Sequence, residues 1–305
     1  MTGFRDMLKW EAYKLTHQGF WTFFSIAFTL LFFYALFLIF IIIYPYLPYQ
    51  NLYFFYCSGT YSVHLLSYIL GNGLFLFFYM QKSVKIDKWK INSIPWPWEK
   101  PQKWSEDLKK LIKSVLFMQL CILPISLSIS GLTVKFRSQP EDLSFKEVLW
   151  QIAFFTVCED FLFYWSHRAM HTPWLYKNIH KQHHEYNVSI SFAAEYAHPL
   201  EYILGNSLPM ALGTLVLGHT NTHIITWFIW VSFRTVSTAD GHCGYDFPWS
   251  PLFFFPFHTG AAFHDFHHSK NQGNYGSFFT IWDTICGTDY QFFRFFEKNE
   301  GKIKD

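Results

Sequence analysis

The sequence predicts an all-α integral membrane protein with about four transmembrane helices, a further membrane hairpin and a cytosolic helical cap. Two observations lead to this fold class. Of the 305 residues, 51% are hydrophobic and 22% aromatic, while only 15% are charged, well below the roughly 25% of an ordinary soluble domain. Several uncharged runs are also long enough to cross the hydrocarbon core of a bilayer, which is about 30 Å thick.

The N-terminal third supplies two of these runs. Residues 19–44 carry no charge, and at about 1.5 Å per residue a helix of that length more than crosses the bilayer. This run is too long for the apolar part of a cleaved signal peptide and has no small-residue cleavage pattern, so we expect a retained anchor. Residues 52–81 are also uncharged, interrupted by His64 and three glycines, and we expect a second span there.

Two more apolar segments and a hairpin follow. We expect spans at 114–134 and 148–165, and the second contains Glu159 and Asp160, which are functional candidates because carboxylates are costly inside a membrane. Residues 202–233 are uncharged but interrupted by glycines, a proline and a polar centre. We interpret this segment as two half-buried helices that enter and leave the membrane on one side.

Lysine and arginine orient the spans, because they stay in cytoplasmic loops close to membrane ends. Arg5, Lys9 and Lys14 precede the first span, and nine lysines lie within 82–113. The N-terminus and this basic loop are therefore expected in the cytosol. Two further crossings return the chain to the cytosol near residue 166. The basic residues of the loop 135–146 fall on the far side, unless that segment is a shallow hairpin that never crosses.

Composition excludes some functions. The formal net charge is +2 with a pI near 8.2, and no basic stripe suggests a nucleic-acid partner. The five cysteines include no CxxC pair, which argues against a zinc ribbon or a disulfide framework. We interpret these cysteines as small apolar residues of the core.

Eight of the fifteen histidines fall in three short clusters with the spacing of metal ligands. An imidazole at position i shares a helix face with those at i+3 and i+4, so each cluster can direct its rings to one place. A single tetrahedral zinc ion cannot use eight imidazoles, so two metal ions are implied. The three histidine boxes are His167/His171, His180/His183/His184 and His264/His267/His268.

Any one of these histidines alone is better explained as a surface or core residue, but three boxes with ligand spacing together favour metal binding. The chain contains its own comparison. His219 and His223 have the same spacing as the first box, yet they fall at the turn of the predicted hairpin. That position is about 24 Å along a helix from the cytosolic ends, so we interpret this pair as a polar turn.

The setting favours iron over zinc, because hydrolysis does not need a membrane whereas oxidation of a hydrocarbon does. Soluble di-iron bundles use glutamate ligands, whereas these boxes are purely nitrogenous. Nearby carboxylates are candidates to accept imidazole N–H groups and so orient the rings, although they could equally be solvated or cap helices. The candidates are Asp265, Glu159 and Asp160, followed by Glu195 and Asp240.

The boxes and their surroundings resemble the fatty acid hydroxylase/sterol desaturase superfamily of membrane di-iron enzymes, whose boxes run HxxxH, HxxHH and HxxHH. The resemblance covers about 145–292, and within the superfamily the chain is most similar to the C-4 methylsterol oxidases. The segments that carry it are WSHRAMHTPWLYKNIHKQHHEY, AEYAHPLE, GHCGYDFP and FHDFHHSKNQGNYGSFFTIWDTICGTD.

This resemblance implies further ligands and partners. His242 in GHCGYDFP is the expected additional ligand, with His198 in AEYAHPLE second, although Pro199 next to it could simply fix a helix start. The resemblance also implies two iron ions, O2 as co-substrate, and electrons from NAD(P)H through cytochrome b5 or its reductase. The C-terminal KIKD does not fit a dilysine retrieval signal, so the expected endoplasmic reticulum membrane, with a cytosol-facing site, follows from the family.

We accordingly expect three regions: 1–144, a membrane anchor region with the basic loop; 145–292, the catalytic domain; and 293–305, a short polar tail. The expected reaction is O2-dependent oxidation of a sterol C-4 methyl group toward the carboxylate, with the bilayer, a sterol and other sterol C-4 demethylation enzymes as partners. The alternatives are sterol C-5 desaturation, C-24 dealkylation, fatty acyl or alkane hydroxylation, and a membrane metal protein without catalysis.

Overall fold

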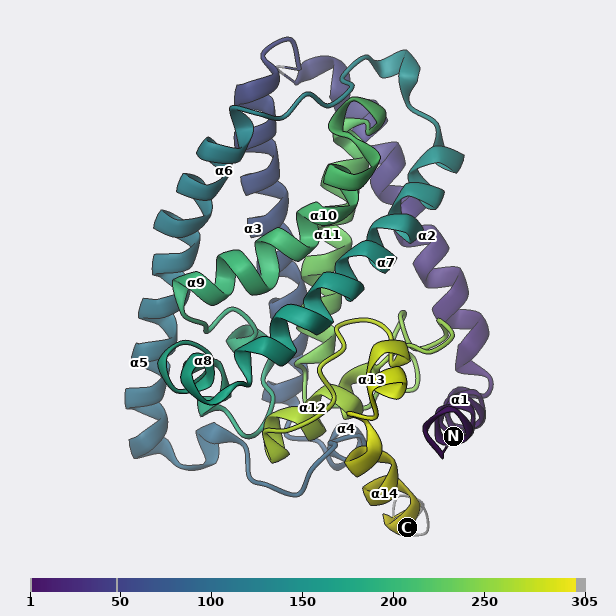
Figure 1. Cartoon of the computed structure of the whole chain (residues 1–305), viewed down its shortest axis with the longest axis vertical. Helices are drawn as coiled ribbons and strands as arrows, with labels where there is room; N and C mark the ends of the chain where they lie inside the picture. The colour runs from purple at the N-terminus through teal and green to yellow at the C-terminus, as the bar shows by residue number, and fades with distance from the viewer. Residues whose placement is uncertain (1, 48, 300–305) are drawn as a thin grey trace.

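A computed structural model describes residues 2–47 and 49–299, and this part of the chain is a bundle of helices without a β-strand. The long helices run side by side along the long axis of the molecule (Figure 1). They are α2 (Trp21–Ile43), α3 (Leu52–Gln81), α5 (Pro101–Phe117) with η3 (Met118–Ile122) and α6 (Leu123–Gly131), α7 (Phe145–Met170), α9 (Pro199–Glu201) with η7 (Tyr202–Ser207) and α10 (Leu208–Leu217), and α11 (Ile224–Gly241).

Five segments of the described chain are long and apolar enough to cross a membrane, which confirms a multi-pass membrane protein. Four correspond to the predicted spans, and the fifth, Pro199–Leu217, is the first arm of the predicted hairpin. The third span differs in extent, because its helix begins at Pro101 rather than near residue 114. Proline is favoured in the first helical turn, where its missing N–H costs nothing, so the helix starts inside the basic loop.

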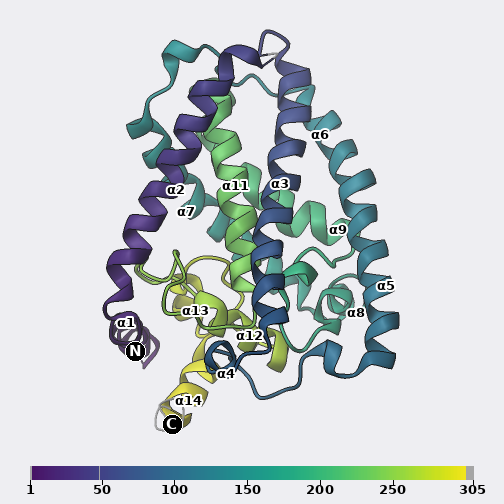
Figure 2. The ribbon, with the colours of Figure 1, turned by 180° about the vertical axis from the view of Figure 1, so that it is seen from behind.

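Helix α11 is the centre of the bundle and corrects the prediction of two half-buried hairpin arms. Fifteen of its 18 residues are buried. It packs against α2, α3 and α7, and Figure 2 shows it enclosed by these neighbours. An uncharged helix that is apolar on all sides fits such a position better than the edge of the bundle. The other arm packs against α7, where Gly213 allows close approach, since a Cβ there would lie 2.8 Å from the Cα of Phe155.

The N-terminal helices and the predicted catalytic region share one hydrophobic core. Phe33 and Phe55 from α2 and α3 belong to the same buried cluster as Phe228 and Trp230 from α11. The helices before residue 144 therefore do more than anchor the chain, because they also form one wall of the bundle around α11.

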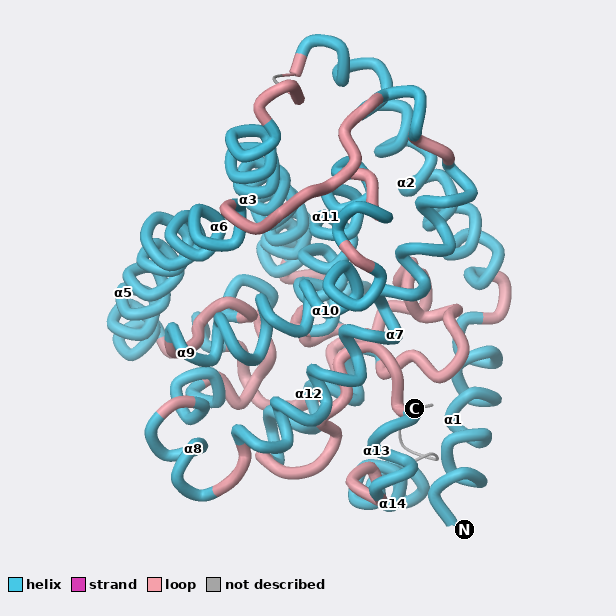
Figure 3. Tube along the Cα trace, turned by 45° about the horizontal axis from the view of Figure 1, so that its top comes forward, coloured by secondary structure: helices cyan, strands magenta, loops and turns pink. Residues whose placement is uncertain are grey.

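One end of the bundle, here called the cap end, carries both described termini and most of the shorter helices (Figures 1 and 3). Trp10 is buried there and its ring lies edge-on to those of Phe253, Phe292 and Phe296. The cap helices are α1 (Thr2–Gln18), α4 (Val84–Asp87), α8 (Pro173–Asn178), α12 (Gly260–Lys270), α13 (Ile281–Cys286) and α14 (Tyr290–Asn299).

The predicted polar tail from residue 293 is only partly right. Phe293 and Phe296 are buried on α14, because this helix packs its aromatic face against α1. Residues 300–305, with the KIKD sequence, lie outside the described residues.

The opposite end of the bundle, here called the far end, contains the turns between the long helices. The loop 132–144 lies there, and its Arg137 forms an ion pair with Glu147 while its backbone N–H donates to Thr222 at 2.9 Å. His219 belongs to a short turn, His219–Asn221, at the same end. The charge that Arg137 places at this end is therefore compensated within the protein.

Candidate metal centre

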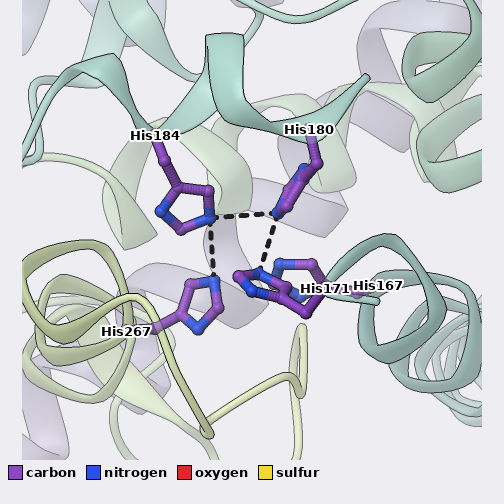
Figure 4. Close-up of side chains that lie close together, drawn as sticks. All are labelled: His167, His171, His180, His184 and His267. Carbon is purple, nitrogen blue, oxygen red and sulfur yellow. Dashed lines mark hydrogen bonds between the residues drawn. The ribbon is translucent and has the colours of Figure 1, made fainter. Parts of the chain in front are cut away.

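Nine histidines meet at the cap end in two neighbouring groups, and they are the eight box histidines together with His242. Within each group the ligand atoms lie within 4.8 Å of one another. Figure 4 shows five of the rings turned toward a common centre. The five-histidine group is His167, His171, His180, His184 and His267, and the four-histidine group is His183, His242, His264 and His268.

Each HxxHH box contributes to both groups. In the second box, His180 and His184 belong to the five-histidine group while His183 belongs to the other. In the third box the division is reversed, with His267 in the five-histidine group. The structure therefore directs positions i and i+4 of a box to one group and position i+3 to the other, whereas the sequence predicted that all three would act together.

Four elements position the ligands. The first box is at the end of α7, where His171 is the C-cap residue, and the third box is on α12. His242 is the C-cap residue of α11. The second box lies on a 3-10 helix, His180–Glu185, rather than on the α-helix that its spacing suggested.

Hydrogen bonds on one side of the rings define which nitrogen faces the centre. The Nδ1 atoms of His167, His242 and His267 donate to the carbonyls of Tyr275, Thr238 and Gly273, at 2.9, 2.8 and 2.6 Å. A neutral imidazole with its proton on Nδ1 has its lone pair on Nε2. These rings therefore direct unprotonated nitrogens inward, which is the state that metal binding requires.

The distances between the inner nitrogens fit metal ions. Two nitrogens bound at about 2.0–2.1 Å to one ion lie about 2.9–3.4 Å apart in right-angled or tetrahedral geometry. The Nε2 atom of His180 lies 3.0 Å from those of His171 and His184. In the other group, His264 Nε2 lies 2.9 Å from His242 Nε2 and 3.2 Å from His268 Nε2. Lone pairs at this spacing repel one another unless a cation lies between them, so the donor set fits two metal ions.

Burial keeps the ligands neutral. It lowers the pKa of His183 to about 4 and that of His171 to about 2, and the neighbouring imidazoles lower the latter further. The pKa values of His264 and His268 are also well below the usual range for the same reasons, with burial as the main cause. At neutral pH the centre therefore offers uncharged nitrogen ligands, without competition from protons.

The carboxylates predicted to accept from the rings bond elsewhere. Asp265 accepts from the Asn92 side chain at 2.8 Å and from the Ser189 N–H at 3.3 Å, and Glu159 accepts from Arg234 at 2.7 Å. The direct role assigned to Asp265, Glu159 and Asp160 is therefore wrong. Glu195 and Asp240 likewise bond to other side chains, namely Gln119 and Ser250.

Asp160 instead acts one step further out, on the loop that supplies the accepting carbonyls. It accepts from the N–H groups of Phe278 and Phe279 at 2.7 and 2.9 Å. Asp283 accepts from those of Tyr275 and Gly276 at 2.8 and 2.7 Å, and burial raises its pKa to about 7. Together the two side chains fix the loop whose carbonyls orient His167 and His267.

Sequence reasoning missed Glu201 as a partner of the centre. Its Oε1 accepts from His180 Nδ1 at 2.8 Å, and both side chains are buried. The signal was present, because Glu201 is a carboxylate directly before an uncharged membrane segment. His258 was also missed, and it lines the cavity at the centre while its Nδ1 accepts from the Gly260 N–H at 3.0 Å.

The other predicted or excluded histidines lie outside both groups. His198 is the N-cap residue of α9, and its Nδ1 accepts from the Leu200 N–H at 3.2 Å. His223 caps α11 in the same manner, accepting from the Ile225 N–H at 3.1 Å. His219 and His223 are both at the far end, so the structure does not bring this pair to the nine histidines.

Two cavities adjoin at the centre. The smaller, of about 60 Å³, is lined by box histidines, His242 and Phe278. The larger, of about 350 Å³, extends between α3, α6, α10 and α11 and is lined mainly by apolar side chains, among them Leu123, Phe136 and Trp227. The residues that line both cavities are Ala194, Asn206, Arg234 and Thr238.

Comparison with known proteins places this arrangement in a family. The profile of the fatty acid hydroxylase family matches residues 152–288. The chain is 36% identical to methylsterol monooxygenase 2-2 of Arabidopsis thaliana over 76% of this chain and 85% of that relative. It is 40% identical to methylsterol monooxygenase 1 of Danio rerio over 77% and 78%.

Another relative has a different name. The chain is 40% identical to the very-long-chain aldehyde decarbonylase GL1-8 of Oryza sativa subsp. indica, over 59% of this chain and 67% of the relative. No solved structure matches the chain. The family profile, the coverage of the methylsterol monooxygenases and the clustered histidines agree with the predicted resemblance. The chain therefore belongs to the fatty acid hydroxylase family and is an oxidoreductase of the monooxygenase class.

Proposed function

We propose that this protein oxidises a C-4 methyl group of a sterol at a non-haem di-iron centre, through the alcohol and the aldehyde to the carboxylate. The observation that carries the proposal is the junction of the two cavities, where a largely apolar cavity of about 350 Å³ meets the histidine-lined one. Ligand sites of about 300–1,000 Å³ with apolar walls and a few polar groups are typical of small-molecule pockets. Two methylsterol monooxygenases that the chain resembles point to the substrate class.

The two histidine groups are the proposed holders of the two iron ions. When bound, the iron would activate O2 and supply the oxidising power to replace a C–H bond of an unactivated methyl group with C–OH. Each round consumes one O2 and two electrons and releases one water, so three rounds take the methyl group to the carboxylate. The protein contributes neutral ligands in fixed positions, an apolar wall that orients the substrate, and a buried site with little access for water.

The chain's own polar groups keep this centre in place. Glu201 holds the His180 ring through Nδ1, and the loop 273–279 holds two further rings through its carbonyls. Ligating imidazoles need such partners, which fix the ring orientation and raise ligand basicity. The reacting carbon of a substrate must reach the box histidines past Arg234 and Asn206, which line both cavities.

We further propose that the cap end faces the cytosol at the endoplasmic reticulum membrane. The nine lysines of the basic loop and the N-terminal helix lie at this end, as cytoplasmic segments do. Electrons from NAD(P)H would then arrive from the cytosol through cytochrome b5 or its reductase. Other sterol C-4 demethylation enzymes would receive the carboxylate product in the same membrane.

A test compares substrates in membranes that contain the protein. We expect a 4,4-dimethylsterol, NAD(P)H and O2 to give 4-hydroxymethyl, 4-formyl and 4-carboxy products, identified by mass spectrometry, and His183→Ala to abolish them. A fatty aldehyde offered in parallel tests the second activity, because one relative is named an aldehyde decarbonylase. Conversion of the aldehyde without any oxygenated sterol would refute the sterol assignment, and full sterol oxidation by His183→Ala would refute the role of the histidine centre.

A further inference from the structure

A buried cluster of four polar side chains borders the larger cavity, and the proposed reaction does not yet use it. We call it the polar cluster. His64 on α3 and Gln119 in the π-helical segment η3 are only 7% and 3% exposed. Such π-helical turns are rare and are frequently found at functional sites. The members of the polar cluster are His64, Gln119, Glu195 and Thr235.

The hydrogen bonds inside the polar cluster fix where its protons are. Thr235 donates its hydroxyl proton to the Val231 carbonyl at 2.9 Å, so its oxygen accepts from His64 Nδ1 at 3.3 Å. The opposite ring nitrogen, Nε2, then accepts from the Gln119 amide at 3.1 Å. The same amide group donates to Glu195 Oε2.

This pattern leaves acceptor capacity without a proton. Glu195 Oε1 lies 3.2 Å from His64 Nε2, but that nitrogen is itself an acceptor and supplies no proton to it. The side-chain oxygen of Gln119 is buried and receives no hydrogen bond from the described residues. Acceptors that remain unsatisfied at membrane depth are costly, and they are usually retained for a ligand or a functional role.

The polar cluster lies at the metal end of the larger cavity. His64, Glu195 and Thr235 all line that cavity. Ala194, next to Glu195, and Thr238, almost one helical turn after Thr235, line both cavities. A polar atom bound by the cluster would therefore lie beside the passage to the histidines, with the apolar part of the same ligand in the cavity behind it.

We propose that the polar cluster binds the hydroxyl group of the lipid substrate, with Glu195 Oε1 accepting the hydroxyl proton, so that the enzyme selects a lipid alcohol. This inference rests on the proposed function and deepens it. A hydroxyl held at the passage places carbons only a few bonds away in the histidine-lined cavity. In a sterol, the C-4 methyl group is three bonds from the oxygen on C-3. Glu195 is thus a specificity-determining residue rather than a part of the metal centre.

The test measures binding rather than turnover. The full-length protein in nanodiscs is titrated with a 4,4-dimethylsterol and with its 3-deoxy analogue, each in competition with a fluorescent sterol. We expect the alcohol to bind the wild-type protein about 10-fold tighter or more, because the analogue leaves a buried acceptor unpaired. In Glu195→Met, which keeps the side-chain length but has no strong acceptor, we expect the two affinities to become equal. Glu195→Gln, which retains a neutral acceptor, should restore part of the difference.

The matched control is Ser126→Ala, since Ser126 lines the same cavity on α6 and should leave the discrimination unchanged. If Glu195→Met does not fold, Thr235→Val removes the oxygen that orients His64 and should reduce the same ratio. Equal affinities in the wild-type protein, or discrimination retained in Glu195→Met, would overturn the inference. Failure of the proposed function is a separate result, because it is the lack of any oxygenated sterol from the wild-type protein.

Discussion

His180 and Glu201 form a buried pair in which the ring Nδ1 lies 2.8 Å from the carboxylate oxygen Oε1. The opposite ring nitrogen of His180 faces both His171 and His184 at 3.0 Å. Glu201 is thus one ring away from the five-histidine group, at the point where the chain enters its fifth apolar helix. Its second oxygen has no hydrogen-bond partner among the described residues, so the imidazole is its main contact.

Replacing this carboxylate should weaken metal binding. We expect Glu201→Leu to lower the metal affinity of the purified protein by about 10- to 100-fold, because an imidazole ligand loses the group that orients it. Metal content after dialysis against a graded chelator series measures the change. The control is Glu185→Gln, an exposed carboxylate directly after the second box, which should behave like the wild-type protein. Equal metal retention in the Glu201 and Glu185 variants would contradict the assignment.

The two histidine groups should differ in tolerance to the loss of one ligand. We expect His264→Ala, which reduces four ligands to three, to lower the bound metal from about two ions to about one, since zinc and iron sites rely on at least three or four protein ligands. His171→Ala leaves four ligands in its group and should retain more metal. Elemental analysis of the purified variants provides the stoichiometry.

His219→Asn serves as the control for these variants, because His219 shares the HxxxH spacing of the first box but lies at the far end. It should retain the wild-type metal content. Loss of metal from this variant would show that the far-end pair is a ligand after all.

Acid should destabilise the metal-free protein. The pKa of His183 is lowered to about 4 and that of His171 to about 2, chiefly by burial, while an unfolded chain titrates near 6.5. Below about pH 6.5 the unfolded state takes up protons that the folded state does not, so the free energy of unfolding falls as the pH decreases. We expect the thermal midpoint in detergent to be flat above pH 7.5 and to fall from pH 6.5 to 5. His183→Asn should reduce this slope, and a midpoint independent of pH would contradict the prediction.

A buried ion pair joins α7 to α11. Arg234 donates to Glu159 at 2.7 Å, and the two side chains are 10% and 3% exposed. Removing one partner leaves an uncompensated buried charge, so we expect Arg234→Met to lower the free energy of unfolding by about 3–5 kcal/mol. The double variant Arg234→Met with Glu159→Leu should recover much of this loss. Chemical denaturation in micelles measures both, and additive effects of the two substitutions would show that the pair is not coupled.

Two glycines in long helices offer a matched comparison. A Cβ at Gly213 would lie 2.8 Å from the Phe155 Cα, whereas nothing lies within 4 Å of a Cβ at Gly73. We expect Gly213→Ala to destabilise the protein by about 1–3 kcal/mol, because α10 must move away from α7. Gly73→Ala should be neutral or stabilising by up to about 1 kcal/mol, since alanine favours helix. Equal unfolding midpoints of the two variants would contradict the close packing.

The sequence predicted the helical membrane fold and the nine clustered histidines because both depend on local patterns. Uncharged runs reveal spans by length alone, and the boxes repeat a spacing along the chain. The burial of α11 was not predictable in this way, because lipid and protein interior select the same residues. The division of each box between two groups was also hidden, since it depends on how α7, α11 and α12 are placed around the second box.

The partners of the imidazoles were harder to predict than the ligands. Asp265 lies inside the third box, yet it bonds to Asn92 and Ser189, while the carbonyls of Tyr275 and Gly273 accept from the rings. A backbone carbonyl has no sequence signature, so proximity in the chain favoured the wrong acceptor. Glu201 did have a signature, as a carboxylate at the edge of an apolar run, but only the fold brings it to His180.

The division of the boxes also sets an order of maturation. Synthesis proceeds from the N-terminus, and early segments fold first. Four ligands of the five-histidine group precede residue 185, whereas three of the four-histidine group come from residue 242 onward. A nascent chain can therefore offer a nearly complete first site before translation reaches the third box, while the second site forms only after α12 has been made and docked. Metal loading should then be sequential, with the four-histidine group filled last.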